Sequence, residues 1–324
     1  MSITEFSLIE KYFYRLKAQR KDVALGIGDD CALLKVPEGQ LMAITVDTLV
    51  ENTHFLPSTS PEDLAWKAIS VNLSDLAAMG AEPAWLSLAL TLPTADESWL
   101  EAFSNSFFEC ADYYDIQLVG GDTTSGPLAV TIQAMGFTPP AAALKRSGTK
   151  PGDLICVTGN LGDAGLGLAI SLNKHTCLTS KHEETLKARF NRPTPRVAEG
   201  IALRNLASSA IDLSDGLAGD LMHILEASEV GAAIELDSLP LSEALLAECD
   251  HQQAIQYALA SGDDYELCFT LAEENLEKLE NAFKSTSSKF TQIGRIVGGT
   301  ELIYTSKGKQ VELILSGYEH FHEL

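Results

Sequence analysis

Apolar positions recur with two different periods along the chain, and this pattern predicts that helices and strands alternate. Phe6, Ile9, Phe13 and Leu16 have the spacing of one helix face, so we expect an amphipathic helix over residues 5–18. Further helices are predicted from Ser60 onward and at residues 95–113, 163–173, 194–207, 214–228 and 273–285. Strands are predicted at residues 41–46, 84–92, 115–119, 128–137, 154–158, 209–213, 231–236, 265–271 and 290–297.

The helix that starts near Ser60 places polar side chains beside a buried stripe. Ser60 followed by Pro61 is typical of a helix start, because proline is tolerated in the first turn. The buried stripe is predicted to consist of Trp66, Ile69, Leu73 and Leu76. Asn72 and Asp75 lie three residues apart and therefore share a neighbouring face of the helix.

A segment rich in turn-forming residues divides the chain into two halves of similar size. A length of 324 residues also favours two domains. We therefore expect an amino-terminal domain over residues 1–138, a linker over residues 139–152 and a carboxy-terminal domain over residues 153–324. Helix and strand alternate in both halves, so the predicted fold class is α/β, of the mixed α+β kind.

The composition is that of a globular protein without membrane segments. Hydrophobic residues make up 45% of the chain, and apolar stretches such as residues 84–92 are too short to span a bilayer. The first residues lack the basic and apolar regions of a signal peptide. Six cysteines without close pairing are expected to be buried free thiols in a reducing cytosol. We therefore expect a cytoplasmic protein that does not bind membranes.

The formal net charge is −22, from 23 Lys and Arg against 45 Asp and Glu. This excess of negative charge argues against nucleic acid as a partner, because nucleic-acid binding depends on a basic patch. It would also repel a phosphate ligand, unless metal cations in the site reverse the local charge.

Aspartates occur within or directly after apolar stretches in six short segments. The segments are residues 26–32, 45–48, 71–76, 120–124, 211–216 and 261–266. A carboxylate near the core is costly unless a cation meets it. Magnesium prefers hard oxygen ligands and often shares them with phosphate. The six segments therefore suggest one convergent pocket that holds several metal ions and phosphate.

Residues 120–124 form the most specific of these segments. Gly120 and Gly121 follow a predicted strand, so their backbone N–H groups can face an anion while Asp122 holds a metal ion. Asp212 and Asp215 flank a strand-to-helix junction, where a helix cap explains one carboxylate but not both.

Other segments leave alternatives open. Asp29 and Asp30 follow glycines and can approach a ligand closely, but a solvated turn has the same pattern. Asp47 ends a predicted strand and could simply cap it. The glycine-rich turn at residues 159–167 could cradle an anion or permit close helix packing. His54, taken alone, has the pattern of a structural residue, and so does Tyr318.

Motifs for several other chemistries are absent from the sequence. There is no Walker-type phosphate loop, no complete dinucleotide fingerprint, no zinc-protease motif, no paired Cys-x-x-Cys and no EF-hand. No nucleophile and base pair is evident either. The remaining motifs favour positioning and charge neutralisation, which phosphoryl transfer requires.

Taken together, these segments resemble the thiamine-monophosphate kinase family, of the superfamily that includes aminoimidazole ribonucleotide synthetase and selenophosphate synthetase. The similarity covers nearly the whole chain and is most specific at residues 26–34, 71–84, 118–124, 210–217 and 262–269. The resemblance implies ATP-dependent phosphorylation of thiamine monophosphate to thiamine diphosphate, with release of ADP. It also implies an amino-terminal α/β domain that forms a homodimer through its sheet, and a carboxy-terminal α/β domain that closes over the site.

The resemblance further implies roles for individual residues. The implied magnesium ligands are Asp30, Thr45, Val46 (through its backbone), Asp47, Asp75, Asp122, Asp212 and Asp215. The implied ATP contacts are Gly121, Asp122, Arg146 and Ser214, and the implied contacts to the thiamine substrate are His54, Asp263 and Tyr318. Among these residues, the predicted catalytic ones are Asp75, Asp122 and Asp212. Asp263 stands where the family commonly has glutamate, so its reach is one methylene shorter.

The mechanism predicted from this resemblance is direct in-line transfer of the ATP γ-phosphoryl group to the terminal phosphate of thiamine monophosphate. The acceptor oxygen has little proton to lose, so no strong general base is needed. Several magnesium ions would offset the repulsion between the two anions. Arg146 would add positive charge, and Tyr318 would stack on the cationic ring system.

Two alternatives remain open at this point. The first is an ATP-dependent ligase of the same superfamily that activates an amide or formyl carbonyl. The second is a non-catalytic protein that binds nucleotide or divalent cations. No reactive amino-terminal cysteine of the selenophosphate synthetase type is evident, and Cys31 is expected to be buried because apolar residues follow it.

Overall fold

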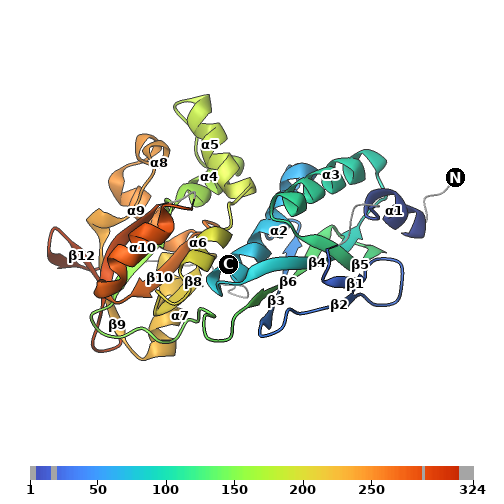
Figure 1. The fold of residues 1–324 in the computed structure, drawn as a ribbon. Coiled ribbons are helices and arrows are strands. Elements are labelled where there is room, and N and C mark those ends of the chain that lie inside the picture. The colour runs from blue at the N-terminus through green and yellow to red at the C-terminus, as the bar shows by residue number, and fades with distance from the viewer. Residues whose placement is uncertain (1–4, 16–19, 287–288, 314–324) are drawn as a thin grey trace. The chain divides into compact units, whose positions relative to one another are not determined.

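The computed structural model describes residues 5–15, 20–286 and 289–313 and has a mixed α/β fold (Figure 1). The chain forms two compact units. The amino-terminal unit comprises Met1–Leu76 and Ala81–Pro140, and the carboxy-terminal unit comprises Ala77–Gly80 and Ala141–Leu324. The predicted fold class is confirmed.

A four-stranded sheet forms the centre of the amino-terminal unit. Its strand order is β3 (Leu41–Val50), β6 (Ala129–Thr138), β4 (Glu82–Leu92) and β5 (Gln117–Ser125). The β4–β5 pair is parallel, whereas β6 is antiparallel to both of its neighbours. Helices α2 (Pro61–Ala78) and α3 (Glu97–Tyr113) lie on one side of this sheet (Figure 1). The unit also contains helix α1 (Glu5–Tyr12) and the short antiparallel pair β1 (Val23–Leu25) and β2 (Leu33–Leu34).

Local signals in the sequence set the starts of the two long helices. The Ser60 hydroxyl accepts a hydrogen bond from the Asp63 N–H at 3.1 Å, which confirms the predicted start of α2. The Asp96 carboxylate caps α3 in the same way, through the Trp99 N–H. In the predicted stripe of α2, Ile69, Leu73 and Leu76 are buried, whereas Trp66 is only partly buried. Ser70 and Asn72, on other sides of the helix, are also inaccessible to solvent.

A seven-stranded sheet forms the centre of the carboxy-terminal unit. Its order is β13 (Lys309–Val311), β12 (Leu302–Ser306), β9 (Gly231–Glu235), β11 (Phe290–Val297), β7 (Leu154–Thr158), β10 (Leu267–Leu271) and β8 (Ser209–Asp212). Among these strands, β12 is parallel to β9 and the other pairs are antiparallel.

The helices of the carboxy-terminal unit pack against this sheet and against one another. They are α4 (Asp163–Ser171), α5 (Ser180–Asn191), α6 (Val197–Ala202), α7 (Leu217–Ser228), α8 (Glu243–Glu248), α9 (His251–Ala260) and α10 (Leu276–Phe283). Two 3₁₀ turns, Leu236–Ser238 and Glu273–Asn275, lie between β9 and α8 and between β10 and α10. The core includes an aromatic cluster in which the ring centroids of Phe269, Phe283 and Phe290 lie 5.0–6.3 Å apart.

Several predicted boundaries of helices and strands were wrong. Strand β3 continues past Asp47 to Val50, and β5 continues through the glycines at 120 and 121 rather than ending before them. Helix α1 ends at Tyr12, and Phe6 is 81% exposed instead of lying on a buried stripe. The α5, α8 and α9 helices and the last two strands were not predicted.

All six cysteines are free, and three of them, Cys110, Cys156 and Cys268, are buried as expected. The prediction of a buried thiol was wrong for Cys31, which is exposed, and Cys177 and Cys249 are only partly buried. Among the described residues, none of the helices combines the length and the apolar character needed to cross a bilayer.

Candidate functional site

A cavity of about 750 Å³ lies in the amino-terminal unit and brings three of the predicted site residues together. Asp30 comes from the loop between β1 and β2, whereas Gly121 and Asp122 come from β5. Apolar side chains such as Phe13 and Met135 line another part of the wall. A concave site that combines apolar walls with a few polar groups is typical of small-molecule binding.

Gly121 is required by the way β5 pairs with β4. A Cβ atom at this position would lie only 1.9 Å from the carbonyl oxygen of Leu88. At Gly120, by contrast, a Cβ atom would meet nothing within 4 Å. The pairing also contains a bulge, because Leu86 faces Leu118 whereas the next residue faces Gly120. Close strand pairing therefore explains one of the two glycines, and open space remains beside the other.

The carboxylates at the loop entrance of this cavity are exposed. Asp29 Oδ1 accepts a hydrogen bond of 2.9 Å from the backbone N–H of Asp30, so the two residues are held in one tight turn. Gly28 has φ of 122°, a left-handed conformation that favours glycine. Both aspartates line the cavity, and Asp29 also shapes the backbone of the turn through this hydrogen bond.

A second group of predicted ligands gathers between β3 and α2. The Thr45 hydroxyl donates a hydrogen bond to Asp75 Oδ2. Asp47 lies two residues further along the same strand, on the same face. Burial, together with the negative charge of Asp75, raises the pKa of Asp47 to about 6. Two carboxylates that disfavour each other's charge in this way would be stabilised by a bound cation.

The donor set of these two groups fits magnesium. The side chains are carboxylates and a hydroxyl, which are the hard oxygen ligands that this ion prefers. In the described part of the chain, the predicted aspartates do not form any group of three whose ligand atoms all lie within 4.8 Å of one another. Magnesium is commonly held by one or two carboxylates with phosphate oxygens completing the shell, so this spacing agrees with a site shared with phosphate.

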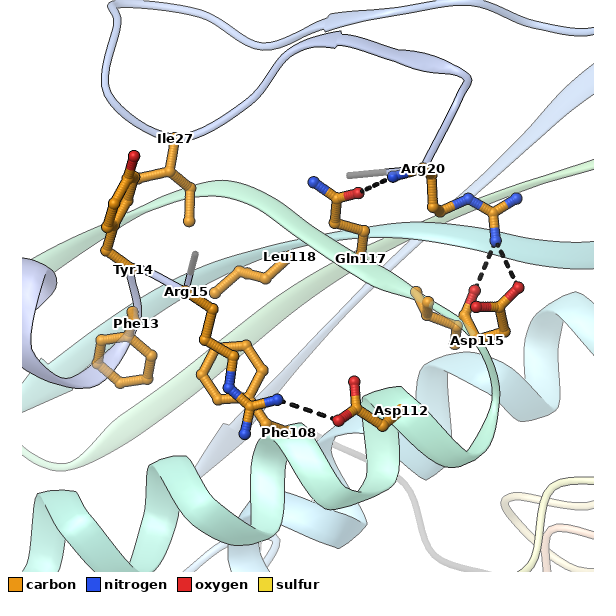
Figure 2. Close-up of a pocket in the computed structure, with 11 residues that line it drawn as sticks. Phe13, Tyr14, Arg15, Arg20, Ile27, Phe108, Asp112, Asp115, Gln117 and Leu118 are labelled. Atoms are coloured by element: carbon orange, nitrogen blue, oxygen red, sulfur yellow. Dashed lines mark hydrogen bonds and ion pairs between the residues drawn. The ribbon is translucent and has the colours of Figure 1, made fainter. Parts of the chain in front are cut away.

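A smaller pocket of about 120 Å³ borders the cavity, with Phe13, Ile27 and Leu118 lining both (Figure 2). Two arginines reach into it, but carboxylates already accompany them. Arg15 donates to Asp112 at 3.0 Å and packs on the ring of Phe108, as Figure 2 shows.

Arg20, the other arginine of the smaller pocket, is oriented by neighbouring groups as well. Its guanidinium forms ion pairs with Asp22 at 3.0 Å and Asp115 at 3.4 Å. Its backbone N–H donates to the Gln117 side chain at 2.7 Å (Figure 2). The positive charge of this pocket is therefore neutralised within the protein, which favours a structural role over anion binding.

His54 lies in the turn that follows β3. The ring Nδ1 of His54 accepts a hydrogen bond of 3.0 Å from the backbone N–H of Val50. The backbone N–H of His54 donates to the Val50 carbonyl at 2.9 Å. The ring thus closes the turn at the end of the strand. This contact gives His54 a structural role besides the predicted substrate contact.

In the carboxy-terminal unit, two segments far apart in the sequence bring four predicted residues together. Backbone N–H groups of Asp263 and Tyr265 donate at 2.8 Å to the carbonyls of Ser214 and Leu213. Asp212 ends β8 directly before this pairing and is buried, whereas Asp215 follows it and is exposed. The predicted residues in this cluster are Asp212, Ser214, Asp215 and Asp263.

The backbone of the second segment is strained. Asp263 and Tyr265 have φ values of 60° and 49°, which are left-handed conformations that non-glycine residues rarely adopt. Gly262 has φ of 69°, and a Cβ atom there would lie 2.4 Å from the Ser214 carbonyl oxygen. Such strain persists where the surrounding structure enforces it, and it is concentrated at functional sites.

The neighbouring turn is held by Asp220, a residue that no sequence motif singled out. Asp220 Oδ2 accepts hydrogen bonds from the N–H groups of Asp215 and Gly216, at 3.0 and 3.1 Å. Asp220 is buried, and this burial raises its pKa to about 7. Its position in the first turn of α7, four residues after a glycine, is the only signal in the sequence, and a solvent-exposed helix residue has the same pattern.

A second missed feature is a buried ion cluster around Glu266. Its carboxylate, which is inaccessible to solvent, receives the Arg196 guanidinium at 2.6 Å, Arg189 at 2.9 Å and the Thr158 hydroxyl at 2.7 Å. Two arginines on one carboxylate offset the cost of burying its charge. The cluster fixes the start of β10, directly after the strained segment.

Close packing explains the glycine-rich turn at residues 159–167. A Cβ atom on Gly159 would lie 2.2 Å from Glu266 Oε1, and one on Gly165 would lie 2.3 Å from the Ser261 Cβ. Gly162 has φ of 86° and donates its N–H to Asp264 Oδ2 at 2.8 Å. Packing, rather than an anion cradle, therefore accounts for these glycines.

Arg146 and Tyr318 are the remaining predicted site residues. Arg146 is exposed and lies on a loop. This loop runs beside β8, since the Ala210 N–H donates to the Lys145 carbonyl at 2.9 Å. Tyr318 lies outside the described residues.

Comparisons with known proteins agree with the sequence motifs. Models of the AIR synthase related protein match the chain twice, with the N-terminal domain at residues 28–138 and the C-terminal domain at residues 150–307. The thiamine-monophosphate kinase of Escherichia coli strain K12 is 54% identical over 322 residues, which is 99% of each chain.

Solved structures give the same result. A crystal structure of the thiamine-monophosphate kinase from Stenotrophomonas maltophilia is similar with a TM-score of 0.84 and 45% identity, over 90% of this chain and 93% of that chain. The structure of AaThiL complexed with AMPPCP and TMP is similar with a TM-score of 0.77 and 31% identity, over 98% and 96%. The chain therefore belongs to the thiamine-monophosphate kinase family and is an enzyme of the phosphotransferase class.

Proposed function

We propose that this enzyme uses ATP to phosphorylate thiamine monophosphate to thiamine diphosphate, with release of ADP. The observation that carries the proposal is the cavity in which Asp30, Gly121 and Asp122 meet, within a chain 54% identical to a thiamine-monophosphate kinase. A volume of about 750 Å³ is of the size expected for a site that takes a nucleotide or a substrate of similar size. The structure of the related AaThiL is a complex with AMPPCP and TMP, which supports a site for both a nucleotide and a thiamine substrate in this enzyme.

The proposed roles follow the two units. In the amino-terminal domain, residues 1–138, we assign ATP binding to Gly121 and Asp122, and substrate contact to His54. In the carboxy-terminal domain, residues 153–324, we assign ATP contact to Ser214 and substrate contact to Asp263 and Tyr318. Arg146, on the linker of residues 139–152, is proposed to contact the phosphates, because its exposed guanidinium can donate to two oxygens at once.

The proposed magnesium ligands are oxygen donors in both units. They are Asp30, Thr45, Val46 (backbone), Asp47, Asp75, Asp122, Asp212 and Asp215. When bound there, magnesium would supply positive charge that reduces the repulsion between two phosphorylated molecules.

The chain's own residues would act by orientation. Thr45 orients the Asp75 carboxylate through its hydrogen bond, and Asp220 orients the turn that carries Ser214 and Asp215. We propose direct in-line transfer, in which an oxygen of the acceptor phosphate bonds to the γ-phosphorus while the bond to the ADP oxygen breaks. The acceptor oxygen already carries negative charge, so no residue is needed to remove a proton.

We further propose that the enzyme is a homodimer formed through the amino-terminal sheet. Met42, Ile44 and Val46 project from the edge strand β3 and are exposed. An exposed row of apolar side chains on a sheet is typical of a protein–protein interface. Light scattering should give twice the mass of the chain, and Ile44→Asp should reduce it to the monomer mass. A monomer mass for the unsubstituted protein would contradict this proposal.

The net charge of −22 supports the expectation that nucleic acid is not a partner. Six free cysteines agree with a reducing compartment, and we propose that the enzyme acts in the cytoplasm.

The proposed activity can be tested with ATP, magnesium and thiamine monophosphate, with thiamine as a control acceptor. We expect thiamine diphosphate and ADP in equal amounts from the monophosphate, and no product from thiamine. Turnover of ATP only with an amide or formyl substrate would indicate the ligase alternative. Binding of ATP and magnesium without consumption of ATP would indicate a non-catalytic protein. Radiolabelled phosphate trapped on the protein would contradict direct transfer.

A further inference from the structure

A cluster of metal-binding side chains lies in the carboxy-terminal unit, apart from the aspartate segments. His175 and Cys177 stand on the loop between α4 and α5, and Glu248 is the last residue of α8. The imidazole, thiol and carboxylate of these residues offer ligand atoms that all lie within 4.8 Å of one another. Among the described residues this is the only group of three or more such side chains that meets this criterion.

One pair of ligand atoms in the cluster has the separation found at a tetrahedral metal site. His175 Nε2 and Glu248 Oε2 are 3.4 Å apart. Zinc lies about 2.0–2.2 Å from nitrogen and oxygen ligands, so two ligands of a tetrahedral ion are separated by roughly 3.3–3.6 Å. A ligand set of nitrogen, sulfur and oxygen favours zinc or a similar transition-metal ion over magnesium, which prefers oxygen alone.

The carboxylate of the cluster is already oriented by groups around it. The Glu248 side chain is completely buried, yet the histidines beside it are about one quarter exposed. Its Oε2 accepts the Leu178 N–H at 2.8 Å, and its Oε1 lies 2.6 Å from His182 Nδ1. Hydrogen bonds of this kind commonly fix the ligands of metal sites from the second coordination shell.

The charges of the cluster also suit a divalent ion. An ionised Glu248 and a Cys177 thiolate together carry two negative charges, which lie close together and repel each other unless a cation is bound. A divalent ion would neutralise both, while neutral His175 would complete three protein ligands and leave a fourth position for water. The partial exposure of the two histidines gives such an ion access from solvent.

We propose that His175, Cys177 and Glu248 form a binding site for a zinc-like divalent transition-metal ion, with His182 holding the carboxylate in place. The ion fastens the loop between α4 and α5 to the end of α8, and these elements lie next to one another in Figure 1. Helix α5 also carries Arg189, which binds the buried Glu266. The site therefore stabilises the part of the unit that supports this ion cluster and takes no direct part in phosphoryl transfer.

The test is a cobalt(II) titration of the full chain after treatment with chelator, with excess magnesium present to compete with cobalt for the carboxylate sites. One equivalent of cobalt should produce a thiolate-to-cobalt charge-transfer absorption, and zinc should remove it by competition. Cys177→Ser should abolish this absorption, whereas Cys249→Ser is the matched control and should retain it. The control thiol is the next residue after Glu248 but donates to the Leu245 carbonyl at 3.2 Å.

Two further variants separate metal binding from folding. His182→Gln should weaken zinc binding by about 10-fold to 100-fold while the charge-transfer absorption persists at saturation. His175→Ala, at a partly exposed position, should lose affinity and keep the circular dichroism spectrum of the folded chain. Zinc should raise the Tm of the unsubstituted protein but not that of Cys177→Ser. Absence of the absorption in the unsubstituted protein, or its survival in Cys177→Ser, would overturn the proposal.

Discussion

The hydroxyl of Thr45 donates a hydrogen bond to Asp75, and this contact joins strand β3 to helix α2 within the amino-terminal unit. The two residues are thirty positions apart in the sequence. The contact fixes one carboxylate oxygen of Asp75 beside Asp47, whose pKa is raised by burial and by the charge of Asp75. The strand and the helix thus hold two acidic side chains close together, as a cation site requires.

Asp75→Asn should lower kcat by on the order of 100-fold or more, because stabilisation of charge is a large part of phosphoryl-transfer catalysis. Asp122→Asn should have an effect of similar size. Both variants should keep the circular dichroism spectrum and the Tm of the unsubstituted protein. Asp29→Asn is the matched control, because Asp29 shapes the turn through a single hydrogen bond to the Asp30 N–H and should matter less. Near-normal turnover of both variants at limiting magnesium would contradict the assignment.

Gly121→Ala should destabilise the fold, whereas Gly120→Ala should not. The added methyl group at Gly121 would meet the Leu88 carbonyl oxygen at 1.9 Å and force β4 and β5 apart, at a cost of about 1–3 kcal/mol or more. At Gly120 the methyl group enters open space, so the free energy of unfolding should change by about 0.5 kcal/mol at most. Urea unfolding of the two variants measures this difference. Equal midpoints would show that the strand pairing tolerates a side chain at both positions.

Asp220→Ala should lower both stability and turnover, although Asp220 is not among the proposed ligands. Its loss leaves two backbone N–H groups without their acceptor, which costs about 1–3 kcal/mol. Displacement of Ser214 and Asp215 should also reduce kcat by about 10-fold or more. Asp220→Asn keeps a carbonyl oxygen that can accept both hydrogen bonds and should restore most of the activity. A kcat for Asp220→Ala equal to that of the unsubstituted protein would remove Asp220 from the positioning of the turn.

Asp264 should make the stability of the protein depend on pH. Burial raises the pKa of Asp264 to about 8, so the folded chain binds a proton that the unfolded chain has released. The free energy of unfolding should therefore decrease as the pH rises from about 4 to about 8, by up to about 1.4 kcal/mol per pH unit from this group. Asp264→Asn removes the titration and should show a shallower decline. Urea unfolding between about pH 5 and about pH 8 measures both slopes, and parallel curves would contradict the prediction.

Much of the fold was predictable because the signals are local. Helix α2 begins where Ser60 and Pro61 predict it, and β7 and β11 have the predicted boundaries. Boundaries failed where a strand continues through polar residues, as β5 does through residues 120–125. There, pairing with β4 supplies the hydrogen bonds that keep glycine and aspartate extended, and local preference predicts a turn instead.

The sequence by itself determined the mixed α/β class, the aspartate segments and the family, because periodicity and short motifs are properties of neighbouring residues. The tertiary structure decided which of these segments meet. The contact of Thr45 with Asp75, the turn held by Asp220 and the cluster of His175, Cys177 and Glu248 each join residues from different elements or different turns. Such contacts depend on strand order and on helix packing, which are set by burial of the whole core and not by any local pattern.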